Sequence, residues 1–212
     1  MKLILMGAPG AGKGTQAEVI SERFEIPAIS TGSVLREAIR SGSELGKIAK
    51  SLIDEGKFVP DNIINPVVAA RIAQPDCAGG FILDGYPRDL AQAEWLEEMG
   101  VQLDKVLFIH LSDEAIITRL SGRRICEDCG ETYHILYQPS NSGERCEKCG
   151  GKLIIRKDDR PETIRERLDT FHRVTYPVVE YYREKGILLE VESAGTVEAT
   201  TEQTLRVLED GQ

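Results

Sequence analysis

The sequence predicts an α/β chain with a three-layer αβα core, built around a five-stranded parallel sheet, and a small cysteine-rich insertion. Short apolar runs with little polar alternation recur between stretches of helical composition, as in parallel sheets buried on both faces. A glycine-rich segment joins the first apolar run to a helix. A third observation is a stretch at 122–159 that is rich in glycine, cysteine and charge and has no helical periodicity.

The elements follow from local signals along the chain. Pro177 predicts a kink in a long helix that has Pro161 in its first turn and ends at Gly186. The predicted strands cover 3–6, 27–29, 81–83, 106–109 and 187–189. Helices without a predicted cap begin at 16, at 161 and at about 198. Four more helices have predicted N-caps: residues 31–33 before a helix that begins at 34, Ser43 before one that begins at 44, and Asp61 and Asp113 as the caps of the other two.

Residues 7–15 read Gly-Ala-Pro-Gly-Ala-Gly-Lys-Gly-Thr, between a strand and a helix. Glycines let backbone N–H groups converge on an anion, and the helix N-terminus adds unpaired donors. The spacing from Gly7 to Gly12 and Lys13 fits the Walker A pattern, although Gly14 comes next and the hydroxyl follows at Thr15. The alternative is an ordinary glycine-rich turn with a surface lysine. Because strand, loop, lysine and helix occur together, we expect a P-loop that binds a nucleoside triphosphate.

The composition limits the function classes. The 212 residues carry a formal net charge of −9, which argues against a general nucleic-acid binder, because a surface that tracks phosphates is basic. The first strand starts at once, so we expect no signal peptide. Of the five cysteines, Cys77 is isolated and interpreted as a small apolar residue, and the pattern favours a reducing, cytoplasmic setting.

The other four cysteines form two Cys-x2-Cys pairs, separated by sixteen residues. This spacing is typical of a zinc ribbon, in which four thiolates close a tetrahedral structural site. The insertion is too small to fold well on an apolar core, and a metal would supply what that core lacks. Two disulfides, four unbound thiols and bound iron are the alternatives. The predicted ligands are Cys126, Cys129, Cys146 and Cys149.

Several separated motifs together resemble the adenylate kinases of the long-lid, zinc-containing type, over essentially the whole chain. That family transfers the terminal phosphoryl group of MgATP to AMP and forms two ADP. The motifs are residues 7–15, Ser30-Thr31-Gly32 with Arg36, Val59-Pro60-Asp61, residues 81–88 with Gln92, residues 119–124, the cysteines with Tyr133-His134, Arg156-x-Asp158-Asp159 and Arg167-Leu168.

The resemblance implies a role for each matched residue. Asp84 resembles the carboxylate that orients Mg²⁺ through its water shell, although an aspartate there could instead cap the following turn. The implied catalytic residues are Lys13, Arg88, Arg123, Arg156, Arg167 and Asp84. The implied ATP contacts are Gly10, Ala11, Gly12, Lys13, Gly14, Thr15, Arg119, Arg123, Thr132, Tyr133 and Val197, with the adenine near the loop 194–197. The implied AMP contacts are Thr31, Arg36, Lys57, Phe58, Val59, Gly85, Tyr86, Pro87, Arg88, Gln92, Arg156 and Arg167.

The same resemblance implies the domain organisation and the partners. The core would comprise 1–29, 60–121 and 160–212, an AMP-binding flap 30–59, and a zinc-binding lid 122–159; flap and lid would close over the substrates and exclude water. Implied cofactors are Mg²⁺ with ATP and a structural Zn²⁺. We expect ATP, AMP and ADP as substrates, no nucleic-acid or membrane partner, and a monomer.

Two positions depart from the family pattern. Ser33 stands where an aspartate is usual, which affects the surroundings of the magnesium site, and Asn62 replaces a common glutamate. Competing interpretations are a kinase for another nucleoside monophosphate or with GTP as donor, a non-catalytic nucleotide sensor, and a P-loop protein whose zinc ribbon reads nucleic acid. Thr31 and Gln92 favour AMP, because an amide both donates to and accepts from an adenine edge.

Overall fold

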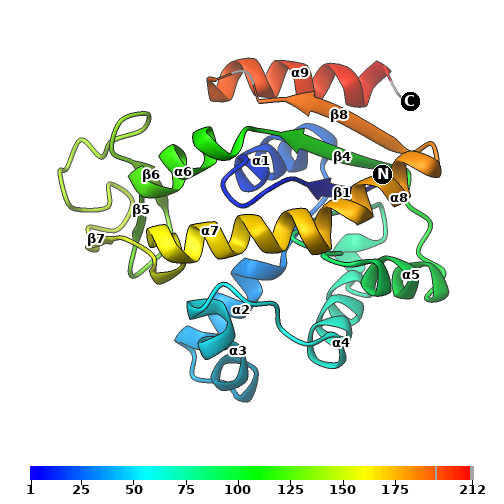
Figure 1. Cartoon of the computed structure of the whole chain (residues 1–212), viewed down its shortest axis with the longest axis horizontal. Coiled ribbons are helices and arrows are strands. Elements are labelled where there is room, and N and C mark those ends of the chain that lie inside the picture. Colours follow the sequence, from blue (N-terminus) through cyan, green and yellow to red (C-terminus); the bar gives the residue numbers. More distant parts are fainter. Residues whose placement is uncertain (194, 211–212) are drawn as a thin grey trace.

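The computed structural model describes residues 1–193 and 195–210. Its centre is a five-stranded parallel sheet in the order β2-β3-β1-β4-β8 (Figure 1). The strands are β1 (Lys2–Met6), β2 (Ala28–Ser30), β3 (Phe81–Asp84), β4 (Lys105–His110) and β8 (Leu188–Glu192). The predicted five-stranded parallel sheet is therefore confirmed, with each strand within three residues of its expected bounds.

Both faces of the sheet are covered, which gives the predicted three layers. Alternate residues of β1 serve opposite faces: Leu3 and Leu5 pack toward α1 and α9, whereas Ile4 and Met6 belong to the larger cluster on the other side. On the first side lie α1 (Lys13–Phe24) and α9 (Val197–Asp210) (Figure 1). The opposite cluster takes buried residues from α4 (Asp61–Ile72), α5 (Leu90–Glu98), α7 (Pro161–Thr170) and α8 (Tyr176–Glu184).

Helices α2 (Thr31–Arg40) and α3 (Glu44–Asp54) lie outside this sandwich, below the sheet in Figure 1. The predicted cap of α3 is confirmed, because the Ser43 hydroxyl accepts from the Gly46 N–H. The cap predicted at 31–33 is wrong by one residue. Ser30 caps α2 by accepting from the N–H of Ser33, so Ser33 lies within the first turn.

Two further predicted caps are also wrong by one residue. Asp61 and Asp113 are the first residues of their helices, and Pro60 and Ser112 occupy the N-cap positions. The Ser112 hydroxyl accepts from the Ala115 N–H at the start of α6 (Asp113–Gly122). An acidic residue in the first turn stabilises a helix through its dipole, so sequence alone does not separate the two positions.

Helix α5 was not predicted. Asp89 caps it by accepting from the N–H of Gln92. Its buried face includes the polar Gln92 beside Ala93 and Leu96, so the apolar periodicity that marks a helix is interrupted.

The predicted long helix from Pro161 is confirmed, with its interruption one turn before Pro177. A π-helical turn, Phe171–Thr175, separates α7 from α8. Proline has no N–H and its ring clashes with the carbonyl group four residues earlier, so the preceding turn widens to accommodate it. Within residues 1–193 and 195–210, no helix combines the length and apolar character needed to span a bilayer.

The cysteine-rich insertion forms a second, small antiparallel sheet in the order β6-β5-β7, at the left of Figure 1. Its strands are β5 (Arg123–Cys126), β6 (Thr132–His134) and β7 (Leu153–Ile154). A 3-10 turn, Lys157–Asp159, then leads back to α7.

Candidate active site

The glycine-rich loop between β1 and α1 has the backbone of an anion-binding loop. Gly10 and Gly12 have φ angles of 85° and 101°, a region that residues with a Cβ rarely adopt. Ala11 is buried behind the loop. Gly14 and Thr15 belong to the first turn of α1, where N–H groups have no intrahelical partner. The predicted P-loop residues thus surround one helix N-terminus.

Lys13, the first residue of α1, folds back over this loop. Its Nζ donates to the carbonyl oxygens of Gly7 at 2.7 Å and Ala8 at 2.9 Å. Burial lowers the pKa of the Lys13 ammonium to about 8; Asp84 opposes that shift, and Arg88 and two further arginines reinforce it. A phosphate near Nζ would replace the carbonyl partners and favour the charged form.

A pocket below the P-loop is lined by all of the predicted AMP contacts except Pro87, which lines the neighbouring pocket. The lining comes from α2, from α3 and the segment after it, from α4, from the loop after β3, from α5, from the 3-10 turn with the residue before it, and from α7. The residues shared with the prediction are Thr31, Arg36, Lys57, Phe58, Val59, Gly85, Tyr86, Arg88, Gln92, Arg156 and Arg167.

Hydrogen bonds fix the polar groups of this pocket. The Thr31 hydroxyl donates to the carbonyl oxygen of Gly85 at 2.9 Å. Gln92 is almost fully buried: its Oε1 accepts from the Arg88 N–H at 2.8 Å, and its Nε2 donates to Asp61 at 2.6 Å. An amide nitrogen has two N–H groups, so one remains to read the edge of a base.

A second pocket lies against the P-loop and shares a wall with the first. Both pockets are lined by Gly56, Phe58, Gly85, Arg88 and Arg167. Lys13 lines only the P-loop side. Two phosphate-bearing ligands, one in each pocket, would therefore meet at Arg88 and Arg167.

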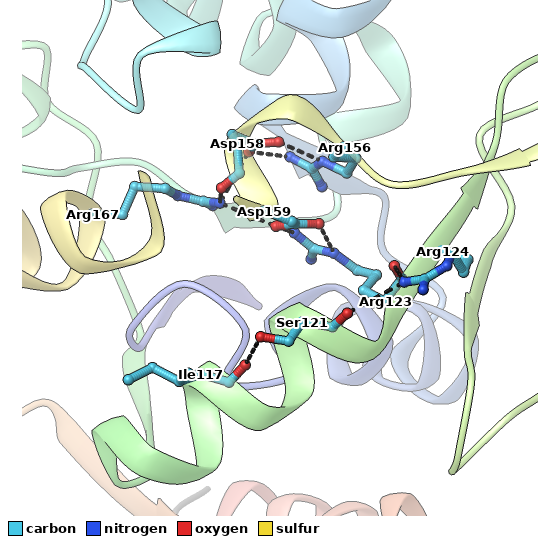
Figure 2. A network of polar contacts seen from close by, with 8 residues as sticks. All are labelled: Ile117, Ser121, Arg123, Arg124, Arg156, Asp158, Asp159 and Arg167. Atoms are coloured by element: carbon cyan, nitrogen blue, oxygen red, sulfur yellow. Dashed lines mark hydrogen bonds and ion pairs between the residues drawn. The ribbon is translucent and has the colours of Figure 1, made fainter. Parts of the chain in front are cut away.

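Three arginines converge on two adjacent aspartates where the lid joins the core (Figure 2). Arg123 holds Asp159 through two hydrogen bonds of 2.8 and 2.5 Å, and Arg156 holds Asp158 through two of 2.9 and 2.7 Å. Arg167 donates to the carbonyl oxygen of Asp158 at 2.8 Å and lies 3.4 Å from the Asp159 carboxylate. Each fork-shaped pair also fits a phosphate, whose oxygens could replace the carboxylate.

Cationic side chains outnumber carboxylates around both pockets. Burial lowers the pKa of Arg167 and of Arg36 to about 10, and it lowers the pKa of Arg88 as well. All three arginines stay charged at neutral pH, so their mutual repulsion favours an anionic ligand. The cations are Lys13, Arg36, Lys57, Arg88, Arg123, Arg156 and Arg167, and the carboxylates are Asp84, Asp158 and Asp159.

Asp84 ends β3 at the edge of the sheet where β1 enters the P-loop, in register with Leu5. This position beside Lys13 fits a carboxylate that holds water around a magnesium ion. Ser33 supplies no second carboxylate, and its Oγ accepts instead from Arg36 at 3.3 Å. Arg36 therefore has a neutral hydroxyl as its partner at this position.

The predicted adenine side of the ATP site is only partly assembled. Arg119 lies across the P-loop, since a Cβ built on Gly12 would be 3.9 Å from its Nη1. Val197 begins α9 and is 49% exposed. The loop 194–197, expected near the adenine, includes Ala194, which lies outside the described residues.

Thr132 and Tyr133 occupy β6 of the lid. Thr132 is exposed, whereas the Tyr133 side chain is buried inside the lid, with its hydroxyl 3.4 Å from the Cys146 Sγ. That hydroxyl also accepts from the Glu147 N–H at 2.9 Å. The expectation that Tyr133 faces ATP is therefore corrected for its side chain, which packs against the cysteine cluster; its backbone could still face the nucleotide.

The four predicted metal ligands come together. The sulfur atoms of Cys126, Cys129, Cys146 and Cys149 all lie within 4.8 Å of one another. A tetrahedral zinc site with Zn–S bonds of about 2.3 Å places its sulfurs about 3.8 Å apart. Cys126 and Cys149 are 3.4 Å apart and Cys129 and Cys146 are 3.6 Å apart, so these are four thiols rather than two disulfides. The donor set fits a metal that prefers thiolates.

Sequence reasoning missed two residues that hold the site. The sequence predicts Asp61 as a helix cap, whereas its carboxylate accepts a hydrogen bond from Gln92. No sequence motif marks Thr175, whose hydroxyl donates to the carbonyl oxygen of Arg88 at 2.8 Å. Both contacts join segments far apart in the chain, which local patterns do not reveal.

The fold and the site define the class: a P-loop phosphotransferase with a cysteine-rich lid. The model of the adenylate kinase family matches residues 5–187. The chain belongs to the adenylate kinase family.

Proteins similar to this chain cover it nearly end to end. It is 49% identical to an adenylate kinase of Caldicellulosiruptor bescii over 98% of this chain and 99% of that protein. An adenylate kinase of Acetivibrio thermocellus is 50% identical, over 98% of each chain. One from Archaeoglobus fulgidus is 47% identical, over 99% of this chain and 98% of the relative.

Proposed function

We propose that this enzyme transfers the terminal phosphoryl group of ATP to AMP and forms two ADP, reversibly. The observation that supports the proposal is the pair of pockets that meet at Arg88 and Arg167, one at the P-loop and one lined by Thr31 and Gln92. A donor triphosphate and an acceptor monophosphate placed in them would face each other end to end.

The reaction needs little covalent help from the protein. An oxygen of the AMP phosphate attacks the γ-phosphorus of ATP, and the bond from that phosphorus to the β,γ-bridging oxygen breaks. Lys13 and the arginines balance the negative charge that spreads over the transferring group, and they hold the reactants in line. Mg²⁺, oriented by water on Asp84, would supply further charge neutralisation on the ATP phosphates.

Each substrate would be recognised by its own set of residues. Thr31 and the remaining N–H of Gln92 would contact the AMP base, with Lys57, Phe58 and Val59 along that pocket. Arg119 would stack beside the ATP adenine, with Thr132 and the Tyr133 backbone nearby. Arg36 and Arg88 would grip the AMP phosphate, and Arg123, Arg156 and Arg167 would leave their aspartates for phosphate oxygens when ligands bind.

The lid 122–159 and the flap 30–59 would close over the substrates and exclude water, which would otherwise accept the phosphoryl group. The four cysteines would hold Zn²⁺ as a structural ion. Each chain carries both pockets, so we propose a monomer that works in the cytoplasm on ATP, AMP and ADP.

A coupled assay with MgATP and AMP, GMP, CMP or UMP tests the proposal. We expect ADP formation that depends on AMP and falls at least about 100-fold in Lys13→Ala and Arg88→Ala, since each removes charge from the transition state. Arg206→Ala is the control, because Arg206 forms an ion pair with Glu202 on the exposed surface of α9, away from both pockets. Turnover of another monophosphate in place of AMP would overturn the base assignments of Thr31 and Gln92. No turnover with any monophosphate would overturn the proposed reaction.

A further inference from the structure

Thr175 lies on the π-helical turn between α7 and α8 and is 8% exposed. Its Oγ1 donates to the carbonyl oxygen of Arg88 at 2.8 Å, a contact between residues 87 positions apart in the sequence. The two residues line the same pocket as Lys13 and Arg167. A buried hydroxyl group thus connects the long C-terminal helix pair to the arginine on the shared wall of both pockets.

The widened turn explains why this hydroxyl is directed across to the loop. A threonine in a regular helix usually returns its hydroxyl to the carbonyl group four residues earlier, which here is that of Phe171. In this structure the Tyr176 N–H donates to the Phe171 carbonyl in a five-residue step. Pro177 favours this wider turn, and Thr175 donates to Arg88 instead of to its own helix.

Arg88 is anchored at three backbone and side-chain positions. Its N–H donates to Gln92, its carbonyl oxygen accepts from Thr175, and its Nε donates to the carbonyl oxygen of Gly85 at 2.8 Å. The Phe58 ring lies 4.9 Å from its guanidinium carbon. Among the described residues, no hydrogen bond engages its two terminal nitrogens, which stay available for a phosphate.

We infer that Thr175 is a positioning residue for phosphoryl transfer, which acts by fixing the backbone of Arg88 and thereby the direction of its guanidinium. This inference rests on the proposed function for its effect on turnover. A phosphate must meet both terminal nitrogens of the arginine at once, so a small rotation of the backbone at Arg88 disturbs the transfer geometry more than ATP binding.

The first test compares Thr175→Val with Thr175→Ser. Valine keeps the shape and removes the donor, so we expect kcat with MgATP and AMP to fall about tenfold, a loss of about 1.4 kcal/mol in transition-state stabilisation. The KM for AMP should rise and the KM for ATP should stay within about twofold. Serine keeps the hydroxyl and should retain kcat within about threefold of the wild type.

Thr204→Val is the matched control. Thr204 is fully buried on α9, and its Oγ1 has no hydrogen-bond partner among the described residues. This variant should keep wild-type kcat and KM. Equal kcat in Thr175→Val and wild type, or equal losses in the serine and valine variants, would overturn the positioning role.

A double-mutant cycle separates positioning from general destabilisation. In an Arg88→Ala background, Thr175→Val should change kcat by less than about twofold, because the group it orients is gone. A second tenfold loss in that background would mean that Thr175 acts on the protein as a whole, and would overturn the inference.

The last measurement does not depend on any substrate. The Nε–H signal of Arg88 in proton–nitrogen NMR spectra, assigned by its absence in Arg88→Lys, should exchange with water at least about tenfold faster in Thr175→Val than in Thr175→Ser. Unchanged exchange would overturn the inference even if the assay showed no AMP turnover. If the wild-type enzyme showed no turnover but the Arg88 Nε–H exchanged faster in Thr175→Val as expected, only the proposed function would be overturned.

Discussion

The core and the lid of this enzyme fold on different physical grounds. The core sheet is covered on both faces by two large clusters of buried apolar residues. The lid has one small cluster, in which two of the three buried members, Cys126 and Cys146, are predicted metal ligands and the third is Tyr133. The core therefore gains its stability from buried apolar surface, whereas we expect the stability of the lid to depend on a metal bound by its four sulfurs. The three arginines and two aspartates at the junction of core and lid are held instead by ion pairs and hydrogen bonds.

This difference assigns separate tasks to the two regions. The core keeps the P-loop and Asp84 at a fixed edge of a rigid sheet. Strand β5 of the lid begins at Arg123, and the return segment carries Arg156, so two of the arginines proposed to bind phosphate lie on a unit that a bound metal would hold together. Loss of the metal would remove these arginines from the site and leave the nucleotide loop intact.

The largest expected effect comes from removal of the metal. Chelation or Cys146→Ser should unfold the small sheet and lower turnover at least about 100-fold, while the core keeps its helical circular dichroism. Structural zinc sites in small domains contribute about 10–16 kcal/mol, far more than the lid's apolar cluster. Hydrogen exchange and metal analysis measure the outcome.

Cys77→Ser is the control for this experiment, because Cys77 is buried in the core cluster. It should leave the metal content unchanged. Retained amide protection in β5 and β6 after complete metal removal would contradict the comparison between core and lid.

A substitution in the core should lower the stability of the core and leave metal binding by the lid unchanged. Leu107 on β4 is fully buried, and Leu107→Ala should lower the free energy of unfolding by about 2–5 kcal/mol, through lost burial and the cavity left behind. Urea unfolding measures this change, and metal affinity should not change. Leu136→Ala in the lid is the control, since Leu136 is 69% exposed. A comparable loss in that variant would argue against a metal-dependent lid.

The junction should respond to acid. Burial raises the pKa of Asp158, but Arg156 and Arg167 outweigh it and hold that pKa below the ordinary value of 3.8. The carboxylate therefore stabilises the fold at pH values above 3.8, and this contribution is lost as pH falls through the lower folded-state pKa. Asp158→Asn should cost about 1–3 kcal/mol at pH 7 and make stability less dependent on pH below about 4.

Urea unfolding at pH 7 and pH 3 measures both effects. Asp76→Asn is the control, because Asp76 pairs with Arg71 at the exposed surface and should give a smaller change. An unchanged acid dependence in Asp158→Asn would exclude this carboxylate as its source.

The smallest effect is expected where the flap touches the lid. The Arg40 Nη1 on α2 donates to the carbonyl oxygen of Asp128, in the turn between the first two cysteines, at 2.9 Å. The contact is exposed, so Arg40→Ala should change the KM for AMP by less than about threefold. Steady-state kinetics in low salt, with Lys47→Ala as the surface control, measures this change. A tenfold rise would show that the contact controls closure.

The sequence by itself determined the fold class, the P-loop and the cysteine cluster, because each depends on local spacing. Two such motifs are the glycine-rich loop between a strand and a helix and the two Cys-x2-Cys pairs. Each predicts the same kind of binding site wherever it lies in the fold. The helix caps at Asp61 and Asp113 were wrong because an acidic residue favours the cap and the first turn alike. Helix α5 was missed because its buried face contains Gln92.

Only the tertiary structure decided which groups hold the predicted site residues in place. The pairing of Arg123 with Asp159, the anchoring of Gln92 by Asp61 and the bond from Thr175 to Arg88 join segments from 31 to 87 residues apart. Such contacts depend on how helices pack against the sheet and on a π turn whose register no local pattern encodes. Local spacing in the sequence specified which chemical groups the site contains. Packing between residues far apart in the sequence set the orientation of these groups, because side-chain orientation depends on the folded chain.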